Sequence, residues 1–198
     1  MSKIIVIAGT PGTGKSSIGT IVATKCQLEI VNLSTLALEK GFVAYYDEAR
    51  QSYVVDEDRL VEYTTQLATR SEKPILVLTH YPEILPRNLV RAVFVLRTHP
   101  LELEKRLLER GWSRRKVNEN VMAEILGVVA HNAINAFGTN VVYEIDTTSG
   151  NFEEIANTIC MAIKGEIKLE PGLKVDWLSE LPLSEVRRFE DYEGSDNY

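Results

Sequence analysis

The sequence predicts an α/β fold in which a five-stranded parallel sheet is flanked by helices on both faces. Five short apolar runs are separated by segments whose apolar residues follow helical spacing, and the first run leads into a glycine-rich loop. Strands that are apolar throughout are typical of parallel sheets covered on both sides. The length of 198 residues favours one compact domain over two.

The expected strands are five apolar runs of five or six residues, rich in Val, Ile and Leu. None of them alternates between apolar and polar residues, so each should be buried on both faces. The runs are residues 3–8, 28–33, 74–79, 92–96 and 141–145.

Capping residues and helical spacing predict five helices between and after these strands. They begin near Lys15, Asp56, Pro100, Ser113 and Asn151. The helix after Ser113 is expected to run unbroken past Val129, because apolar residues recur along one side of it. Residues 34–55 have mixed periodicity and are assigned to neither helix nor strand.

Charge and composition narrow the class of protein. The net charge is −6, but residues 166–198 hold nine acidic against four basic side chains, so the remainder is nearly neutral. A general nucleic-acid binder is therefore not expected.

No signal peptide or membrane-length apolar stretch is evident, and we expect a cytoplasmic protein without membrane contact. Cys26 and Cys160 are far apart and lack CxxC or histidine-rich company, so they are expected to be buried thiols without a disulfide or metal.

A phosphate-binding loop is predicted from Gly9 to Ser17, because residues 9–16 fit G-x-x-x-x-G-K-[ST] between a strand and a helix. Glycines let the backbone N–H groups turn inward toward phosphate oxygens. A lysine adds a point charge near the β- and γ-phosphates, and the hydroxyl that follows it can bind Mg²⁺. Chance occurrence of a glycine turn is the alternative, and the flanking strand and helix argue against it.

A basic cluster occupies the corner between two expected helices. Arg106 and Arg110 are four residues apart and share one helix face, and Gly111 follows. Three more cationic residues come next: Arg114, Arg115 and Lys116. Such a segment could close over a transferring phosphoryl group. The alternative is a solvated basic helix end, which the helix dipole favours by itself.

Several motifs together resemble one known family. They are residues 9–15 (GTPGTGK), 56–59 (DEDR), 94–98 (FVLRT) and 106–112 (RLLERGW), followed by Lys116, Asn120 and Glu124. Over residues 3–165 this combination is similar to the archaeal branch of the adenylate kinase isoenzyme 6 family. The phosphate loop is generic, whereas the DEDR and RGW blocks are more specific.

The resemblance implies a P-loop nucleoside monophosphate kinase fold over residues 1–165. It implies transfer of the terminal phosphate of ATP to AMP or another monophosphate, with Mg²⁺, and a possible ATPase activity. It also implies a role in late 16S rRNA maturation through a small-subunit ribosomal protein, with transient contact to the small-subunit precursor. A monophosphate-binding segment would span about 32–55 and a lid about 109–119.

The resemblance also assigns roles to single residues. ATP would contact Gly12, Gly14, Lys15, Ser16, Ser17 and Arg110. The catalytic residues would be Lys15, Arg110 and His80, and the metal ligand would be Ser16.

One position departs from the family pattern. Relatives carry Asp-x-His after the third strand, and the acid helps to hold Mg²⁺ or its water, whereas this chain has Leu78 in the acidic position before His80. The ATPase activity is therefore open. For His80 the alternative is a strand-end histidine that bonds a backbone group.

Residues 166–198 are expected to form an extension that docks in part, over 173–183, and ends in a disordered acidic segment. Two other functions stay open. The chain could be a nucleotide-gated ribosome-assembly factor in which phosphoryl transfer is incidental, or a kinase of a small metabolite, because phosphate loops do not specify the acceptor.

Overall fold

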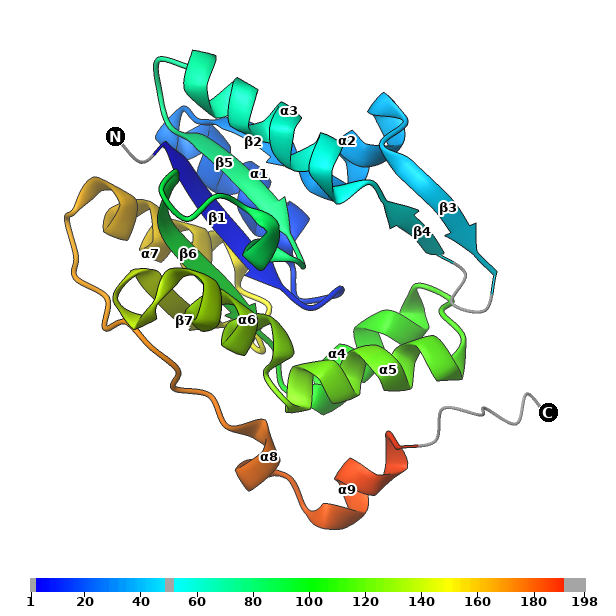
Figure 1. The fold of residues 1–198 in the computed structure, drawn as a ribbon. Helices are drawn as coiled ribbons and strands as arrows, with labels where there is room; N and C mark the ends of the chain where they lie inside the picture. The colour runs from blue at the N-terminus through cyan, green and yellow to red at the C-terminus, as the bar shows by residue number, and fades with distance from the viewer. Residues whose placement is uncertain (1–2, 49–51, 191–198) are drawn as a thin grey trace.

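A computed structural model describes residues 3–48 and 52–190 (Figure 1). It confirms the predicted parallel sheet, in the order β2–β5–β1–β6–β7. The strands are β1 (Ile4–Gly9), β2 (Glu29–Asn32), β5 (Ile75–Thr79), β6 (Val90–Arg97) and β7 (Val142–Asp146). All five predicted strands are present, and only β6 begins clearly earlier than expected.

Helices cover both faces of the sheet, as predicted. The helices α1 (Lys15–Cys26) and α7 (Phe152–Lys164) cover one face, and α2 (Leu33–Lys40), α3 (Glu57–Arg70) and α6 (Val128–Phe137) cover the other. In β1, Ile4 and Val6 pack against the layer of α2, α3 and α6, whereas Ile5 and Ile7 pack against the layer of α1 and α7. This alternation explains why β1 is apolar at every position.

Residues 34–55 contain a helix and a hairpin that periodicity did not reveal. The side chain of Asn32 accepts hydrogen bonds from the Ser34 and Thr35 amides and caps α2. The strands β3 (Val43–Asp47) and β4 (Ser52–Val55) then pair as a separate antiparallel hairpin (Figure 1). The hairpin does not belong to the main sheet, and Tyr45 and Tyr53 are exposed. Its sequence therefore lacks the apolar run of a buried strand.

The single long helix expected after Ser113 is wrong. The chain forms α4 (Pro100–Glu109), then α5 (Arg114–Ile125), and breaks before α6 at Gly127, whose φ is 61°. Arg97 Nη2 donates to the Glu124 carbonyl at 2.8 Å, and a Cβ on Gly127 would lie 3.5 Å from Arg97 Nη1. The break thus lets a buried arginine approach the end of α5.

The described part of the extension packs against the α4–α5 corner. It contains α8 (Trp177–Glu180) and α9 (Leu183–Arg188). Outside the extension, two short 3₁₀ helices span Pro82–Ile84 and Thr139–Val141. Trp177 is buried and Phe189 is 0% exposed. Phe189, Leu181 and Val186 share one apolar cluster with residues of α4 and α5, among them Leu103, Leu107, Val117 and Val121. Burial therefore extends beyond residue 183, whereas the acidic end at 191–198 lies outside the described residues.

No helix within residues 3–48 and 52–190 is long and apolar enough to cross a membrane.

Candidate functional site

The candidate site lies at the carboxyl edge of the sheet. The loops after β1, β2, β5 and β6 all leave at this edge, because the strands are parallel. The chain first places β2 and β5 on one side of β1 and then crosses to β6 on the other side of β1. Ligands of open α/β sheets bind at such a change of direction. The glycine-rich loop follows the central strand and therefore lies at this point.

The loop needs its glycines for conformation and for close packing. Gly9, Gly12 and Gly14 have φ of 146°, 96° and 97°, which other residues rarely adopt. A Cβ on Gly12 would lie 2.6 Å from Leu103 Cδ1, and one on Gly14 would lie 3.0 Å from the Phe152 ring. The helix α1 begins directly at Lys15 without a side-chain cap. Its first N–H groups therefore suit an anion.

Lys15 has backbone partners instead of a carboxylate. Its Nζ donates to Gly9 O at 2.7 Å and to Thr10 O at 3.0 Å. The pKa of Lys15 is lowered to about 7, mainly by burial; Glu124 opposes this shift and the positive charge of Arg110 contributes to it. A bound phosphate would supply the negative charge that this lysine lacks.

Glu124 holds the loop from behind. Its Oε2 accepts from Thr10 Oγ1 at 2.6 Å. Its Oε1 accepts from Arg97 Nε at 2.8 Å, from the Thr98 amide at 3.0 Å and from Trp177 Nε1 at 3.3 Å. One buried carboxylate therefore joins the phosphate loop, the end of β6, α5 and the extension.

Arg97 binds a second carboxylate, that of Glu144 on β7, through Nη1. Glu144 in turn accepts from the backbone amides of Lys174 and Val175 in the extension. Burial alone would lower the pKa of Arg97, but Glu124 and Glu144 raise it above its ordinary value. The guanidinium thus stays charged at 2% exposure.

Buried threonines continue this support. Thr13 Oγ1 donates to Thr10 O at 2.9 Å, and Thr147 Oγ1 donates to Thr13 O at 3.0 Å. The hydroxyls of Thr98 and Thr147 lie 2.7 Å apart. Sequence reasoning missed this set of hydrogen bonds, because its threonines follow three strands, β1, β6 and β7, that are far apart in the sequence.

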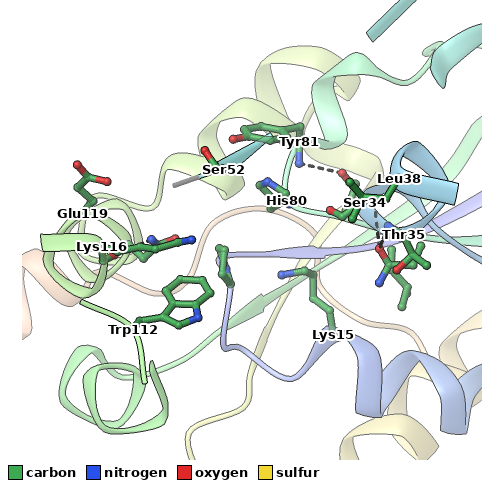
Figure 2. A pocket seen from close by; sticks show the side chains of 15 residues that line it. Lys15, Ser34, Thr35, Leu38, Ser52, His80, Tyr81, Trp112, Lys116 and Glu119 are labelled. Carbon is green, nitrogen blue, oxygen red and sulfur yellow. Dashed lines mark hydrogen bonds between the residues drawn. The ribbon is translucent and has the colours of Figure 1, made fainter. Parts of the chain in front are cut away.

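A cavity of about 770 Å³ opens in front of the loop (Figure 2). Lys15 enters from the loop, His80 and Tyr81 from the segment after β5, and Trp112 and Lys116 from the α4–α5 corner. Ser34, Thr35 and Leu38 of α2 line the side beyond Lys15 (Figure 2).

A second cavity, of about 360 Å³, adjoins the first. The two share six lining residues: Ser34, Leu38, Ser52, Thr79, His80 and Tyr81. The second cavity extends under the hairpin, where it is lined by Tyr53, Val54, Leu60 and Ile84. Its apolar and aromatic walls with a few polar groups are typical of a small-molecule site.

His80 is uncharged at neutral pH. Its pKa is lowered to about 4, mainly by burial and to a smaller extent by the charge of Lys15. Its ring lies against Tyr81, with 3.9 Å between the ring centroids. His80 can therefore donate one hydrogen bond and accept another, but it brings no positive charge to a phosphate.

Ser16 and Ser17 are exposed on the first turn of α1. Ser16 lines a neighbouring hollow that shares Asn32, Thr35 and Leu78 with the large cavity. Within the described ranges, no group of three or more His, Cys, Asp or Glu residues could hold a metal. A metal here would thus rely on Ser16 and on phosphate oxygens.

Leu78 is 3% exposed and packs on Gly19 of α1, where a Cβ would lie 2.6 Å from Leu78 Cδ2. The position that is acidic in the family pattern is therefore apolar and built into the packing of α1 on β5.

Within the basic cluster, two arginines form ion pairs, whereas Arg110 forms none with the described residues. Arg114 binds Glu104 at 2.6 Å, and Arg115 binds Glu119 at 3.2 Å. Arg110 is exposed and has no hydrogen bond or ion pair from its side chain to any described residue. It does not line the large cavity, although its charge acts on Lys15.

Arg106 is mostly engaged. Its Nε binds Glu102 at 2.8 Å, and Nη2 donates to Thr147 O at 3.0 Å. Its Nη1 is buried and has no hydrogen-bond partner among the described residues. A buried N–H group normally has an acceptor, which here would be a water molecule or a ligand atom.

Solved structures with the same fold include a kinase. A shikimate kinase from Acinetobacter baumannii, solved with shikimate, aligns with a TM-score of 0.59 and 16% identity, and covers 83% of this chain and 94% of the other. The YorR protein from Bacillus subtilis aligns with a TM-score of 0.52 and 16% identity, over 82% of this chain and 96% of the other. At these identities the likeness establishes the fold alone.

Sequence comparisons establish the family. Residues 5–127 match the family described as an AAA domain. A protein named "Putative adenylate kinase" from Sulfurisphaera tokodaii is 33% identical over 97% of both chains, and one of the same name from Saccharolobus islandicus is 38% identical over 79% of this chain and 81% of the other. An "Adenylate kinase isoenzyme 6 homolog" from Caenorhabditis elegans is 33% identical over 84% of this chain and 91% of the other. The chain therefore belongs to the family of P-loop nucleotide kinases that contains these archaeal adenylate kinases and the isoenzyme 6 homologue.

Proposed function

We propose that this protein is a broad-specificity nucleoside monophosphate kinase, which transfers the terminal phosphate of ATP to AMP or another monophosphate. One observation carries the proposal: the cavity that contains Lys15 adjoins a second cavity, and His80 and Tyr81 line both. A donor bound on the phosphate loop and an acceptor in the second cavity would meet at this shared wall. Transfer needs this proximity more than it needs covalent chemistry.

ATP is the proposed donor. The backbone from Gly12 to Gly14 and the first turn of α1, with Lys15, Ser16 and Ser17, would bind its phosphates. The buried Nη1 of Arg106 offers one further donor to the nucleotide. Mg²⁺ would be held by Ser16 and phosphate oxygens, and when bound it neutralises charge between the β- and γ-phosphates.

The proposed acceptor segment spans about 32–55, of which residues 49–51 lie outside the described part. Within that segment, the hairpin contributes Tyr53 and Val54 to the second cavity, and α2 contributes Ser34 and Leu38. Aromatic and aliphatic walls suit the flat face of a base, and hydroxyls suit its polar edge. A volume of about 360 Å³ is in the range of small-ligand sites.

In the proposed reaction an oxygen of the acceptor monophosphate attacks the γ-phosphorus of ATP. The bond from that phosphorus to the β–γ bridging oxygen breaks, and two nucleoside diphosphates form. A phosphate oxygen is already anionic at neutral pH, so no general base is required. Lys15 stabilises the charge on the transferred group, and uncharged His80 positions an acceptor oxygen through a hydrogen bond.

Arg110 is proposed to complete the site when a lid at about 109–119 closes. Its neighbours Arg114 and Arg115 are engaged by carboxylates, whereas the Arg110 side chain has no such partner in the described structure. Gly111, with φ of 74°, allows the turn that carries it. A lid arginine of this kind acts mainly in the closed, reacting complex.

A second function is a nucleotide-gated assembly factor that acts on the small ribosomal subunit through a ribosomal protein. The observation that favours it is the buried, apolar Leu78 beside the cavity, because a site without the usual acid would turn over ATP alone slowly. The ATPase side activity is proposed with the kinase function, and the same leucine would keep it slow.

One assay separates the two functions. ADP formation from ATP is measured with and without AMP, on the wild type and on Lys15→Ala. A monophosphate kinase should be stimulated by AMP at least about tenfold, which corresponds to about 1.4 kcal/mol. ADP formation that is indifferent to AMP would favour the nucleotide-gated switch. Lys15→Ala should abolish the stimulated rate, and a rate within about tenfold of wild type would show that the site is misplaced.

Arg110→Ala should lower kcat by about 100-fold or more and change the ATP dissociation constant by less than about threefold, because its charge acts chiefly in the transition state. Arg115→Ala is the matched control, since Arg115 is paired with Glu119, and it should stay within about threefold of wild type. Steady-state kinetics and equilibrium ATP binding give the two numbers. Loss of ATP affinity with unchanged kcat would contradict the assignment.

ATP binding should take up a proton above neutral pH. Free Lys15 has a pKa of about 7, so at about pH 8 most of it is uncharged, and the phosphates of ATP raise this pKa. Uptake should approach roughly 0.9 proton at that pH, and affinity should fall as pH rises. Calorimetry in two buffers of different ionisation enthalpy measures the uptake. Lys25→Ala should leave it unchanged, and absence of uptake in the wild type would rule out Lys15 as the titrating group.

A further inference from the structure

The two cysteines of the chain, 134 positions apart, meet in the fold. Cys26 is the last residue of α1, and Cys160 lies in α7. Their sulfur atoms are 2.8 Å apart. Their pairing could not be predicted, because neither cysteine lies in a spacing motif and the packing of α1 on α7 is a long-range contact.

The two cysteines differ in their environments. Cys160 is buried, with its sulfur 3.9 Å from Val22 O, whereas Cys26 is partly exposed. Beside the pair, Lys25 Nζ binds Glu153 Oε1 at 2.6 Å and Asn157 Oδ1 at 2.7 Å. An ion pair and a hydrogen bond therefore also connect the two helices beside the sulfurs.

We propose that Cys26 and Cys160 form an intramolecular disulfide bond when the protein meets a low-molecular-weight disulfide oxidant. A disulfide needs about 2.05 Å between the sulfurs, so they have to approach by under about 1 Å. Helices that are already in contact can supply this without rearranging the fold. The proposal is independent of the kinase function.

The reaction proceeds as two exchange steps. The Cys26 thiolate attacks the oxidant disulfide, forms a mixed disulfide and releases one thiolate. The Cys160 thiolate then attacks the Cys26 sulfur and releases the second thiolate. The protein loses two electrons and two protons, and the oxidant disulfide is reduced to two thiols.

The difference in exposure decides the order of these steps. The pKa of Cys160 is raised to about 12, mainly by burial and also by the contact with Cys26, and the nearby charges of Lys164 and Lys25 oppose this shift. The buried thiol is therefore unreactive toward reagents in solution. It is suited to the second, intramolecular step, in which its target is already in contact.

The cross-link would join α1 and α7 at the end of α1 that lies away from the phosphate loop. Cys26 ends the helix that begins at Lys15, and α7 begins with Phe152, which packs on Gly14. The bond would join the two helices that support the loop, without entering the cavity. It would also close a chain loop of about 135 residues, which strongly restricts the unfolded state. We therefore expect the melting temperature to rise by about 10 °C.

The test uses the full-length chain incubated with oxidised glutathione. Free thiols are then counted in denaturant, the intact mass is measured, and the sample is run on a non-reducing gel. The proposal predicts a monomer without free thiols, lighter by two hydrogen atoms, which melts about 10 °C above the same sample treated with dithiothreitol.

Two variants serve as controls. Cys160→Ala should stop at a glutathione adduct on Cys26, and Cys26→Ser should not react, with no reductant-dependent change in melting for either. The wild-type measurement stands even if a variant folds poorly. A wild-type chain that keeps two thiols, retains the glutathione adduct or forms covalent dimers would overturn the proposal.

Discussion

Arg97 carries its positive charge at 2% exposure between the carboxylates of Glu124 and Glu144, and the rest of the site is arranged around this cluster. A buried ion pair adds little net stability by itself, but removal of one partner leaves an uncompensated charge that costs roughly 3–5 kcal/mol. The buried charge of Arg97 therefore needs all its partners. The helix ends between α5 and α6 at Gly127, which lets the guanidinium reach the end of α5. The need to pair this buried charge therefore decides where α5 ends.

The two sides of the phosphate loop differ, because in the described structure only its back contacts this buried cluster. Behind the loop, Glu124 binds Thr10 and Trp177, so loop, corner and extension share one carboxylate. In front, Lys15 binds only backbone carbonyls among the described residues, and its pKa is lowered to about 7. A loop that is held rigidly from behind, with a cation that lacks its own counter-ion, is preorganised for a polyanion.

Features set by local sequence could be predicted, and features set by long-range contacts could not. The five strands, the phosphate loop and the caps at Asp56 and Asn151 follow from short-range pattern, and the structure has each of them. The β3–β4 hairpin escaped, because its residues lie outside the main sheet and lack the signature of burial. The break at Gly127 could not be predicted, because the apolar pattern continues across it. Its cause, Arg97, lies 30 positions earlier in the sequence. The candidate site divides similarly: sequence motifs indicated Lys15 and His80, whereas Thr10 and its bond to Glu124 become visible only in the fold.

The most direct test of this account is a double-mutant cycle between Thr10 and Glu124, measured as ATP affinity. Thr10→Val and Glu124→Gln each weaken the hydrogen bond that fixes the loop, so their effects on the dissociation constant should overlap. The account predicts that the double variant loses less binding free energy than the sum of the single variants, by at least about 1 kcal/mol. Thr10→Val combined with Glu153→Gln, on the distant α7, should be additive. Additivity within about 0.5 kcal/mol for the Thr10–Glu124 pair as well would contradict the claim that Glu124 holds the phosphate loop.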